Sequence, residues 1–558
     1  MRRSPFAAMI LLAGSLLTGL GFCALLPPFE GFDENAHYAY IQQIAQTGTW
    51  PRLNDPVPAE VDAYLEAAPA PRALGSRWTY PAFFAASPDT IRAGAAAVHA
   101  PRDPARPWRA GVAGNWEGQH PPLYYALLAP VWSISKGWSI YEQLLLLRGV
   151  SYLLAWGGLV ITIFSIARAS ATSPIAPLLV LAPALWPGLF PMWFPEMARI
   201  GNDSLVLLLL AVAWVVTGKA LGSRGHIGHF AVLGAICGLG LLTKATVLPF
   251  VAALGLFLAW RTWRVCGDAA ALRSSVARML VLGLVTAAVA GWWYVKNVID
   301  NGNLLGFNDI ILLEQHGGLL KGLNEKFSLP MALRGPGATA MTFLWVGSWS
   351  AILPPRLTEI PLAMLLVVIV AGWTWRVART KRISDLDVVA ALTLALFVLA
   401  VLRQILTFIA LFGVHSGGAW YLHSFAPLLA PMVGRGLAEA KSWRRARLLV
   451  GVLVVYPLLF LPFATALHLF HFAGCLDQPA GDPHVGLAAF AACAASPREI
   501  LDNLAMLGTP ALALALFGAG WIMMLVAVVH VVARCLPRPE QRGLPAGAVD
   551  PASSAERV

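Results

Sequence analysis

Long apolar runs separated by polar stretches dominate the chain. A run of about 20 apolar residues is long enough to cross a lipid bilayer as a helix. Such runs lie at residues 6–27, 142–168, 172–190, 202–221, 228–243, 245–261, 279–297, 359–378, 386–411, 418–435, 446–468 and 507–534. The pattern predicts an all-α integral membrane protein with about 12 transmembrane helices.

The runs at 228–243 and 245–261 are the shortest, and Lys244 lies between them. They are consistent with a re-entrant pair or with two short tilted crossings.

The polar stretches differ between the two predicted sides of the membrane. Segments 28–141, 298–358 and 469–506 fall on one side, while short connections rich in Arg and Lys fall on the side of both termini. Because basic residues mark cytoplasmic connections, both termini are predicted to be cytoplasmic and the three long segments to be outside. We expect short interfacial helices in the first outer segment, one membrane domain over 1–536, and a disordered cytoplasmic tail at 537–558.

Composition agrees with this topology. Hydrophobic residues make up 58% of the chain and charged residues 12%, which is far from the composition of a soluble domain of this length. The formal charge of +11 is concentrated in the short connections, so it indicates topology and gives no reason to expect nucleic acid as a partner.

Two of the six cysteines, Cys475 and Cys493, share the last outer segment. We expect them to form a disulfide if that segment lies in an oxidising compartment. No Cys or His spacing is typical of a zinc site.

The sequence Asp33-Glu34-Asn35-Ala36-His37 follows the first apolar run. If a helix begins at Asp33, then Asp33 and His37 share one face and Glu34 points elsewhere. Asp33 is therefore a candidate reactive carboxylate at the membrane edge, although Asp is also a common helix N-cap.

A second motif is His120-Pro121-Pro122-Leu123-Tyr124-Tyr125. The proline pair is typical of a helix start, which places His120 near a positive helix end. His120 and Tyr124 are candidates for binding an anionic head group, and the alternative is an interfacial His beside an aromatic anchor.

A third motif, Glu196, Arg199 and Asp203, begins the run at 202–221. Asn202-Asp203 is compatible with a simple helix cap. The adjacent acid and base favour a second acidic site that faces the first one.

Several cations lie within or beside apolar runs, where an unpaired charge is costly. We expect Lys296 and Arg148 to extend towards the membrane surface. Lys244 lies in a helix break. Arg403 lies deeper in its apolar run, so an anionic partner is expected for it.

Two aromatic stretches, 342–349 and 415–423, complete the candidate site; the second contains Tyr421 and His423. Aromatic residues of this kind form either an interfacial belt or a stacking platform for a sugar ring. Gly417-Gly418 would let the backbone approach a ligand closely.

Together these motifs resemble those of the GT-C superfamily of integral-membrane glycosyltransferases. The resemblance rests on the acid pair after the first helix, the His-Pro-Pro-Leu-Tyr-Tyr element, Asp203, and a Trp-Trp-Tyr-x-x-Asn turn at 292–297 followed by Gly302. It is greatest for a bacterial branch with DExxH in the first outer loop, and more distant for protein O-mannosyltransferases and the lipid A aminoarabinose transferase.

The resemblance implies that Asp33 is the general base and that Glu34 supports the site or the acceptor. It implies that His120, which stands where relatives have Lys, contacts the phosphate of the carrier. A neutral imidazole is a weaker partner for an anion than an ammonium group, so Lys244 or Arg403 could supply the missing charge. Ala419-Trp420-Tyr421 also departs from the Gly-Arg-Tyr of this branch, which removes one expected phosphate contact.

The implied activity is transfer of one sugar, with inversion, from a polyprenyl-phosphate carrier to an envelope glycan, lipid or protein on the periplasmic face of the bacterial inner membrane. Relatives differ in their need for a divalent cation; Asp33, Glu34 and Asp203 could hold Mg²⁺ or Mn²⁺, although no ligand spacing requires it. The alternatives are a secondary transporter and a polymerase or ligase of the O-antigen type.

Overall fold

The computed structural model describes residues 4–169, 175–443, 446–477 and 483–535. Nine helices in these ranges are long and apolar enough to cross a membrane. They are α1 (Ser4–Leu25), α7 (Ile140–Ala169), α10 (Asp203–Leu221), α12 (Leu248–Arg264), α13 (Ala269–Asn301), α17 (Ile360–Thr380), α18 (Asp385–Phe412), α20 (Arg447–Phe472) and α23 (Pro510–Cys535). The predicted all-α membrane fold is confirmed.

Three of the predicted crossings correspond to shorter helices: α8 (Ala176–Leu189), α11 (Ile227–Leu241) and α19 (Ala426–Ala440). The run at 418–435 does not begin as an α-helix, because residues Ala419–Phe425 form a 3₁₀ helix, η5, and α19 starts only afterwards. Glycines at 417 and 418 and a proline at 427 explain this break, since Gly is a poor helix former and Pro favours the first turn. The predicted tail at 537–558 lies outside the described residues.

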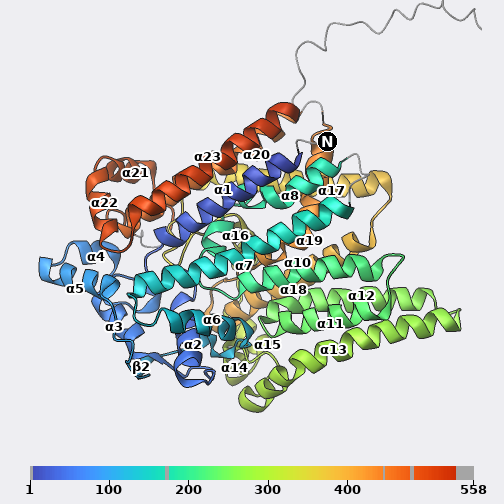
Figure 1. Ribbon diagram of the computed structural model, residues 1–558, viewed down its shortest axis with the longest axis horizontal. Helices are drawn as coiled ribbons and strands as arrows, with labels where there is room; N and C mark the ends of the chain where they lie inside the picture. The colour runs from blue at the N-terminus through green and yellow to red at the C-terminus, as the bar shows by residue number, and fades with distance from the viewer. Residues whose placement is uncertain (1–3, 170–174, 444–445, 478–482, 536–558) are drawn as a thin grey trace, which may run out of the picture.

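The long helices lie side by side in one bundle (Figure 1). The first, α1, packs along α23, and the two run in opposite directions, which places both described chain ends at one end of the bundle (Figure 1). Small residues permit this contact: a Cβ at Gly520 would lie 2.4 Å from the carbonyl oxygen of Gly14 and 2.5 Å from Oγ1 of Thr18.

Short elements gather at the other end of the bundle, towards the left and bottom of Figure 1. The first outer segment contributes α2 (Glu34–Thr47), α3 (Ala59–Ala67), η1 (Arg72–Leu74), α4 (Tyr80–Phe84), α5 (Pro88–His99), η2 (Trp116–Gln119), α6 (Leu123–Ile134) and an antiparallel pair, β1 (Pro56–Pro58) with β2 (Ala110–Gly114). The other outer segments contribute α14 (Asn308–Gln315), α15 (Leu319–Lys326), α16 (Leu329–Leu344), η4 (Arg356–Thr358), α21 (Leu487–Ala494) and α22 (Pro497–Ala505).

Two short elements lie at site residues between crossings: α9 (Trp193–Met197), which contains Glu196, before α10, and η3 (Ala245–Val247), which directly follows Lys244, between α11 and α12. In the last outer segment Cys475 and Cys493 form a disulfide, with their Cα atoms 5.9 Å apart. This bond holds α21 to the chain that leaves α20.

Candidate active site

Asp33 ends a tight loop between α1 and α2. Its backbone is left-handed, with φ of 56°, and Phe29 in the same loop also has a positive φ of 64°. Such angles are unfavourable for residues other than Gly and persist where surrounding contacts enforce them. The Asp33 side chain makes no capping hydrogen bond to α2; instead it accepts one from Nε1 of Trp116, at 2.8 Å. The carboxylate is therefore available for chemistry.

Glu34 anchors this loop to the bundle. It is fully buried and accepts hydrogen bonds from Nε and Nη2 of Arg148 on α7, at 2.7 and 2.5 Å. The backbone N–H of Ile200 donates a third bond, at 3.1 Å. The expectation that Arg148 extends to the membrane surface is wrong, because its guanidinium is 0% exposed and paired with Glu34.

Glu30 anchors the other side of the loop. Its side chain accepts hydrogen bonds from Oγ of Ser348 at 2.6 Å, the backbone N–H of Ser350 at 3.0 Å and the hydroxyl of Tyr80 at 2.7 Å. Its carbonyl oxygen accepts another from the backbone N–H of Trp349, at 3.0 Å. Two buried carboxylates, one on each side of Asp33, thus explain how its unfavourable backbone conformation is maintained.

The predicted second acidic group lies beside this loop. Arg199 binds Glu196 at 2.7 Å and Asp203 at 3.2 Å, and its Nη1 donates to the carbonyl oxygen of Phe32 at 2.9 Å. The loop can approach this closely because residue 31 is Gly: a Cβ there would lie 2.5 Å from Cβ of Arg199.

Lys244, in the break between α11 and α12, completes this group. Its Nζ lies 2.6 Å from Oδ2 of Asp203 and 4.2 Å from the centre of the Tyr421 ring. The structure therefore brings together Asp33, Glu196, Arg199, Asp203, Lys244 and Tyr421 from four separate parts of the chain.

His37 and His120 flank Glu117, a carboxylate that the sequence analysis missed. Nε2 of His120 lies 2.7 Å from Oε2 of Glu117, and Nδ1 of His37 lies 3.7 Å from the same oxygen. Nδ1 of His37 also lies 2.9 Å from the hydroxyl of Tyr125. The sequence did offer a signal for Glu117, because it is an acid three residues before His120 and directly after Trp116.

The electrostatic surroundings of Asp33 differ from those of the other acids. The pKa of Asp33 is raised to about 6, because burial and the charge of Glu117 raise it more than the charge of Arg199 lowers it. Within the part of the chain that the structure describes, Asp33 makes no ion pair, whereas Glu117 is paired and the pKa of its carboxyl is lowered by His120 and His37 against the effect of burial. Burial also lowers the pKa of His37, to about 3. Asp33 is thus a carboxylate whose pKa suits a general base.

The carboxylates proposed for a divalent cation do not fit one. Glu34 is occupied by Arg148, and Asp203 by Lys244 and Arg199. No group of three His, Cys, Asp or Glu side chains in the described ranges is arranged to hold a metal ion. Glu34 and Asp203 are therefore not free to bind a cation.

Four candidate residues lie apart from the reactive groups. Tyr124 is buried, bonded to Ser151 at 2.6 Å and to the backbone N–H of Gly201 at 3.0 Å, so it supports the start of α10. His423 forms hydrogen bonds with Nε1 of Trp186 and the carbonyl oxygen of Phe343. Lys296 forms an ion pair with Asp300. Arg403 is exposed on α18, and its charge opposes the rise that burial causes in the pKa of Asp309 on α14.

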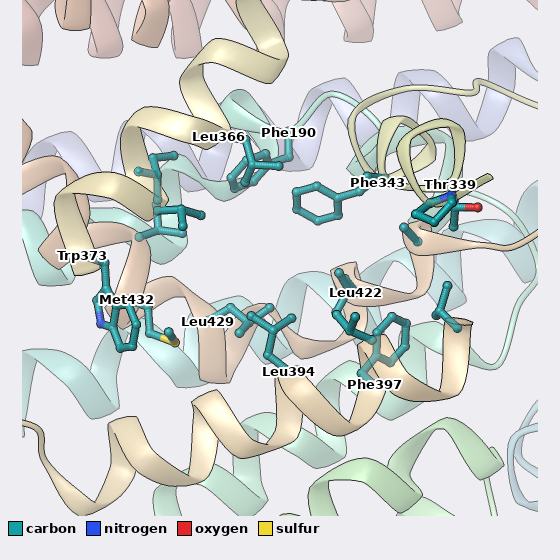
Figure 2. A pocket seen from close by; sticks show the side chains of 18 of the residues that line it. Phe190, Thr339, Phe343, Leu366, Trp373, Leu394, Phe397, Leu422, Leu429 and Met432 are labelled. Atoms are coloured by element: carbon teal, nitrogen blue, oxygen red, sulfur yellow. The ribbon is translucent and has the colours of Figure 1, made fainter. Parts of the chain in front are cut away.

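An apolar cavity of about 380 Å³ lies next to η5; Figure 2 shows it from close by. Side chains from α16, α17, α18 and α19 line it, including Phe343, Leu366, Phe397 and Met432. Figure 2 shows these side chains facing one common space. Leu422 of η5 also lines the cavity, one residue from Tyr421, which contacts Lys244; η5 thus separates the cavity from the charged groups.

Comparisons with known proteins give distant likenesses. No protein-family model and no curated protein matches the chain. The chain is similar to ArnT from Cupriavidus metallidurans bound to undecaprenyl phosphate, at 13% identity and a TM-score of 0.42, over 94% of this chain and 77% of that one.

The chain is also similar to the Archaeoglobus fulgidus oligosaccharyltransferase AglB in complex with an inhibitory peptide and a dolichol-phosphate, at 12% identity and a TM-score of 0.35. That match covers 94% of this chain and 56% of the archaeal one.

Proposed function

We propose that the protein is a membrane glycosyltransferase that moves a single sugar from a polyprenyl-phosphate carrier to an envelope glycan, lipid or protein. The reaction takes place on the periplasmic face of the bacterial inner membrane, and both termini are cytoplasmic. The observation that carries this proposal is the site itself: Asp33, which makes no ion pair with any described residue, lies near two buried cations, Arg199 and Lys244.

Asp33 acts as the general base. Its carboxylate takes the proton of an acceptor hydroxyl while that oxygen attacks the anomeric carbon of the donor sugar. The bond between the anomeric carbon and the phosphate oxygen breaks, and its electron pair leaves with the carrier phosphate. Attack from the face opposite to the leaving group gives inversion.

Lys244 and Arg199 stabilise the leaving phosphate. Negative charge grows on the phosphate as the glycosidic bond breaks, and cations fixed in a buried site favour that charge. Both cations share Asp203 as a partner, with Lys244 at 2.6 Å and Arg199 at 3.2 Å, so their side chains are held in place before a donor binds. His120, held by Glu117 at 2.7 Å, is a further donor to the phosphate when it is protonated.

The apolar cavity accommodates part of the hydrocarbon chain of the carrier. Its lining is apolar and aromatic, which suits a lipid chain and disfavours a sugar or an ion. Leu422 of η5 lines the cavity and its neighbour Tyr421 contacts Lys244, so the phosphate of a carrier whose chain occupies the cavity lies within reach of the cations.

The test is a donor screen with the purified protein in lipid nanodiscs. Polyprenyl phosphates carrying different radiolabelled monosaccharides are incubated with envelope glycans, lipids and proteins, and labelled products are sized. Transfer of one sugar with release of the free carrier phosphate is the expected result. Transfer of an oligosaccharide would instead identify a polymerase or ligase, and solute movement without consumption of any carrier-linked sugar would identify a transporter; either result would overturn the proposal.

A further inference from the structure

Three aromatic residues from distant parts of the chain meet beside Asp33; we call Phe32, Trp349 and Trp420 the aromatic wall. The rings of Phe32 and Trp420 are stacked, with centroids 5.0 Å apart and an interplanar angle of 8°. The ring of Trp349 meets Phe32 edge-on, with centroids 5.4 Å apart. These residues belong to the first outer loop, the second outer segment and η5.

Two residues of the aromatic wall are chain neighbours of groups at the two chemical ends of the site. At one end, Phe32 directly precedes Asp33 in the loop. At the other end, Trp420 directly precedes Tyr421, with ring centroids 5.4 Å apart, and the Tyr421 ring lies 4.2 Å from Nζ of Lys244. In a single displacement, the sugar that is transferred must lie between the base and the leaving phosphate. The stacked pair Phe32 and Trp420 thus joins the residue next to Asp33 to the residue next to Tyr421, whose ring contacts Lys244.

The two tryptophans have unused hydrogen-bonding capacity. Trp349 and Trp420 are partly exposed, but their Nε1 atoms are buried and have no hydrogen-bond partner among the residues that the structure describes. A buried donor without a partner is unfavourable, so a ligand hydroxyl that reaches it gains a favourable interaction. Such a ligand needs an apolar face for the rings and hydroxyl groups at its edge.

We propose that the aromatic wall binds the pyranose ring of the donor sugar, with the apolar face of the sugar on the indole rings and its hydroxyls towards the indole N–H groups. This inference rests on the proposed function and adds to it the subsite for the transferred sugar. The aromatic wall itself carries no charge, so the recognised part of the sugar is a neutral ring, and the charged groups of the site remain for the acceptor and the phosphate.

A glycine fixes the orientation of one side of the aromatic wall. A Cβ at Gly418 would lie 2.8 Å from two atoms of the Trp420 ring and 3.0 Å from the Tyr421 ring. An alanine at this position must therefore displace at least one of the two rings. Gly337 on α16 is a matched control, because a Cβ there has no neighbour within 4 Å.

The experiment measures binding of two lipids to the purified full-length protein in nanodiscs: undecaprenyl phosphate alone, and undecaprenyl phosphate that carries the sugar accepted in the donor screen. The variants are Trp349→Leu and Trp420→Leu, with Trp138→Leu as a control at a side chain that is 46% exposed. We expect the wild type to bind the sugar-bearing lipid more tightly than the bare lipid. Each wall variant should bind the sugar-bearing lipid about tenfold more weakly and the bare lipid equally well.

Two further variants separate the aromatic wall from a structural role. Trp420→Phe keeps a ring and removes the indole N–H, so we expect a smaller loss than for Trp420→Leu. Gly418→Ala should weaken binding of the sugar-bearing lipid, whereas Gly337→Ala should not. A general packing defect would weaken binding of both lipids together.

The outcomes distinguish this inference from the proposed function. If the wild type transfers sugar and the wall variants keep the donor affinity but raise the KM of the acceptor, the aromatic wall holds the acceptor and the inference is overturned. Unchanged donor affinity and unchanged KM in the wall variants would also overturn it. Absence of any carrier-dependent transfer by the wild type would overturn the proposed function as well.

Discussion

Substitution of Arg148 by Met tests the anchor that holds the Asp33 loop. The Arg148 guanidinium donates to both oxygens of Glu34, at 2.7 and 2.5 Å, and to the carbonyl oxygens of Cys23, Leu26 and Pro27, at 3.1, 2.6 and 2.7 Å. Met fills much of the same volume but leaves a fully buried carboxylate and these carbonyls without their partner. Breaking a buried ion pair in this way costs about 3–5 kcal/mol.

A double-mutant cycle separates the energy of the Glu34–Arg148 interaction from the other effects of Arg148→Met. The double variant Glu34→Gln/Arg148→Met removes the uncompensated charge, so we expect it to be more stable than Arg148→Met alone, with an interaction energy of about 0.5–3 kcal/mol. The free energy of unfolding is measured by reversible SDS titration with tryptophan fluorescence. Arg92→Met is the control, since Arg92 forms an exposed ion pair with Asp89 that contributes little.

The outcome that refutes the reasoning is specific. A loss of less than about 1 kcal/mol in Arg148→Met, similar to an exposed pair, would mean that the guanidinium reaches water. Glu34 would then not be the buried anchor of the loop. We also expect Arg148→Met to lose sugar transfer, because the left-handed conformation of Asp33 would no longer be enforced.

Three further predictions concern the site and its supports. Because the pKa of Asp33 is about 6, its carboxyl is protonated below that pH, and the transfer rate should fall as the pH drops through 6. The charge of Glu117 raises the pKa of Asp33, so Glu117→Gln should shift this fall in rate to lower pH. Replacing Cys475 and Cys493 by Ser should lower the thermal stability, by an amount equivalent to roughly 3 kcal/mol, and the melting temperature of the variant should not respond to reductant. An equal response of the wild type and the variant to reductant would contradict the disulfide. Val401→Trp narrows the apolar cavity and should raise the KM for the lipid-linked donor with little change in kcat; an unchanged KM would exclude the cavity as the carrier site.

The membrane architecture was predictable because hydrophobic length is a local property. Each of the nine long helices corresponds to one continuous apolar run, and the break between 228–243 and 245–261 at Lys244 was visible in the sequence. The run at 418–435 was misread, because hydropathy alone does not register that paired glycines and a following proline favour a 3₁₀ segment before α19.

The candidate site was predictable in its residue types more than in its pairings. Short motifs at Asp33, His120 and Asp203 were recognisable, and the structure brings them to one end of the bundle. The partner of a buried charge lies on another helix, however, so sequence spacing could not show that Arg148 binds Glu34.

Spatial neighbours that sequence spacing does not show also explain the outcomes for Arg403 and Glu117. Arg403 is far along its apolar run and suggested a buried cation, but the angular position of a residue on a helix decides whether it faces the bundle or its surroundings. Glu117 was missed because its role depends on the two histidines that meet it in space, of which only His120 is nearby in sequence.

The most direct test of the account compares the wild type with Asp33→Asn in a single-turnover transfer assay with the purified protein and its accepted donor. Asp103→Asn is the matched control, since Asp103 is an exposed acid of the same outer segment. The account predicts that Asp33→Asn folds and binds the donor as the wild type does but transfers sugar about 10²–10⁴-fold more slowly, while Asp103→Asn is unchanged. Transfer by Asp33→Asn at the wild-type rate would contradict the assignment of Asp33 as the general base.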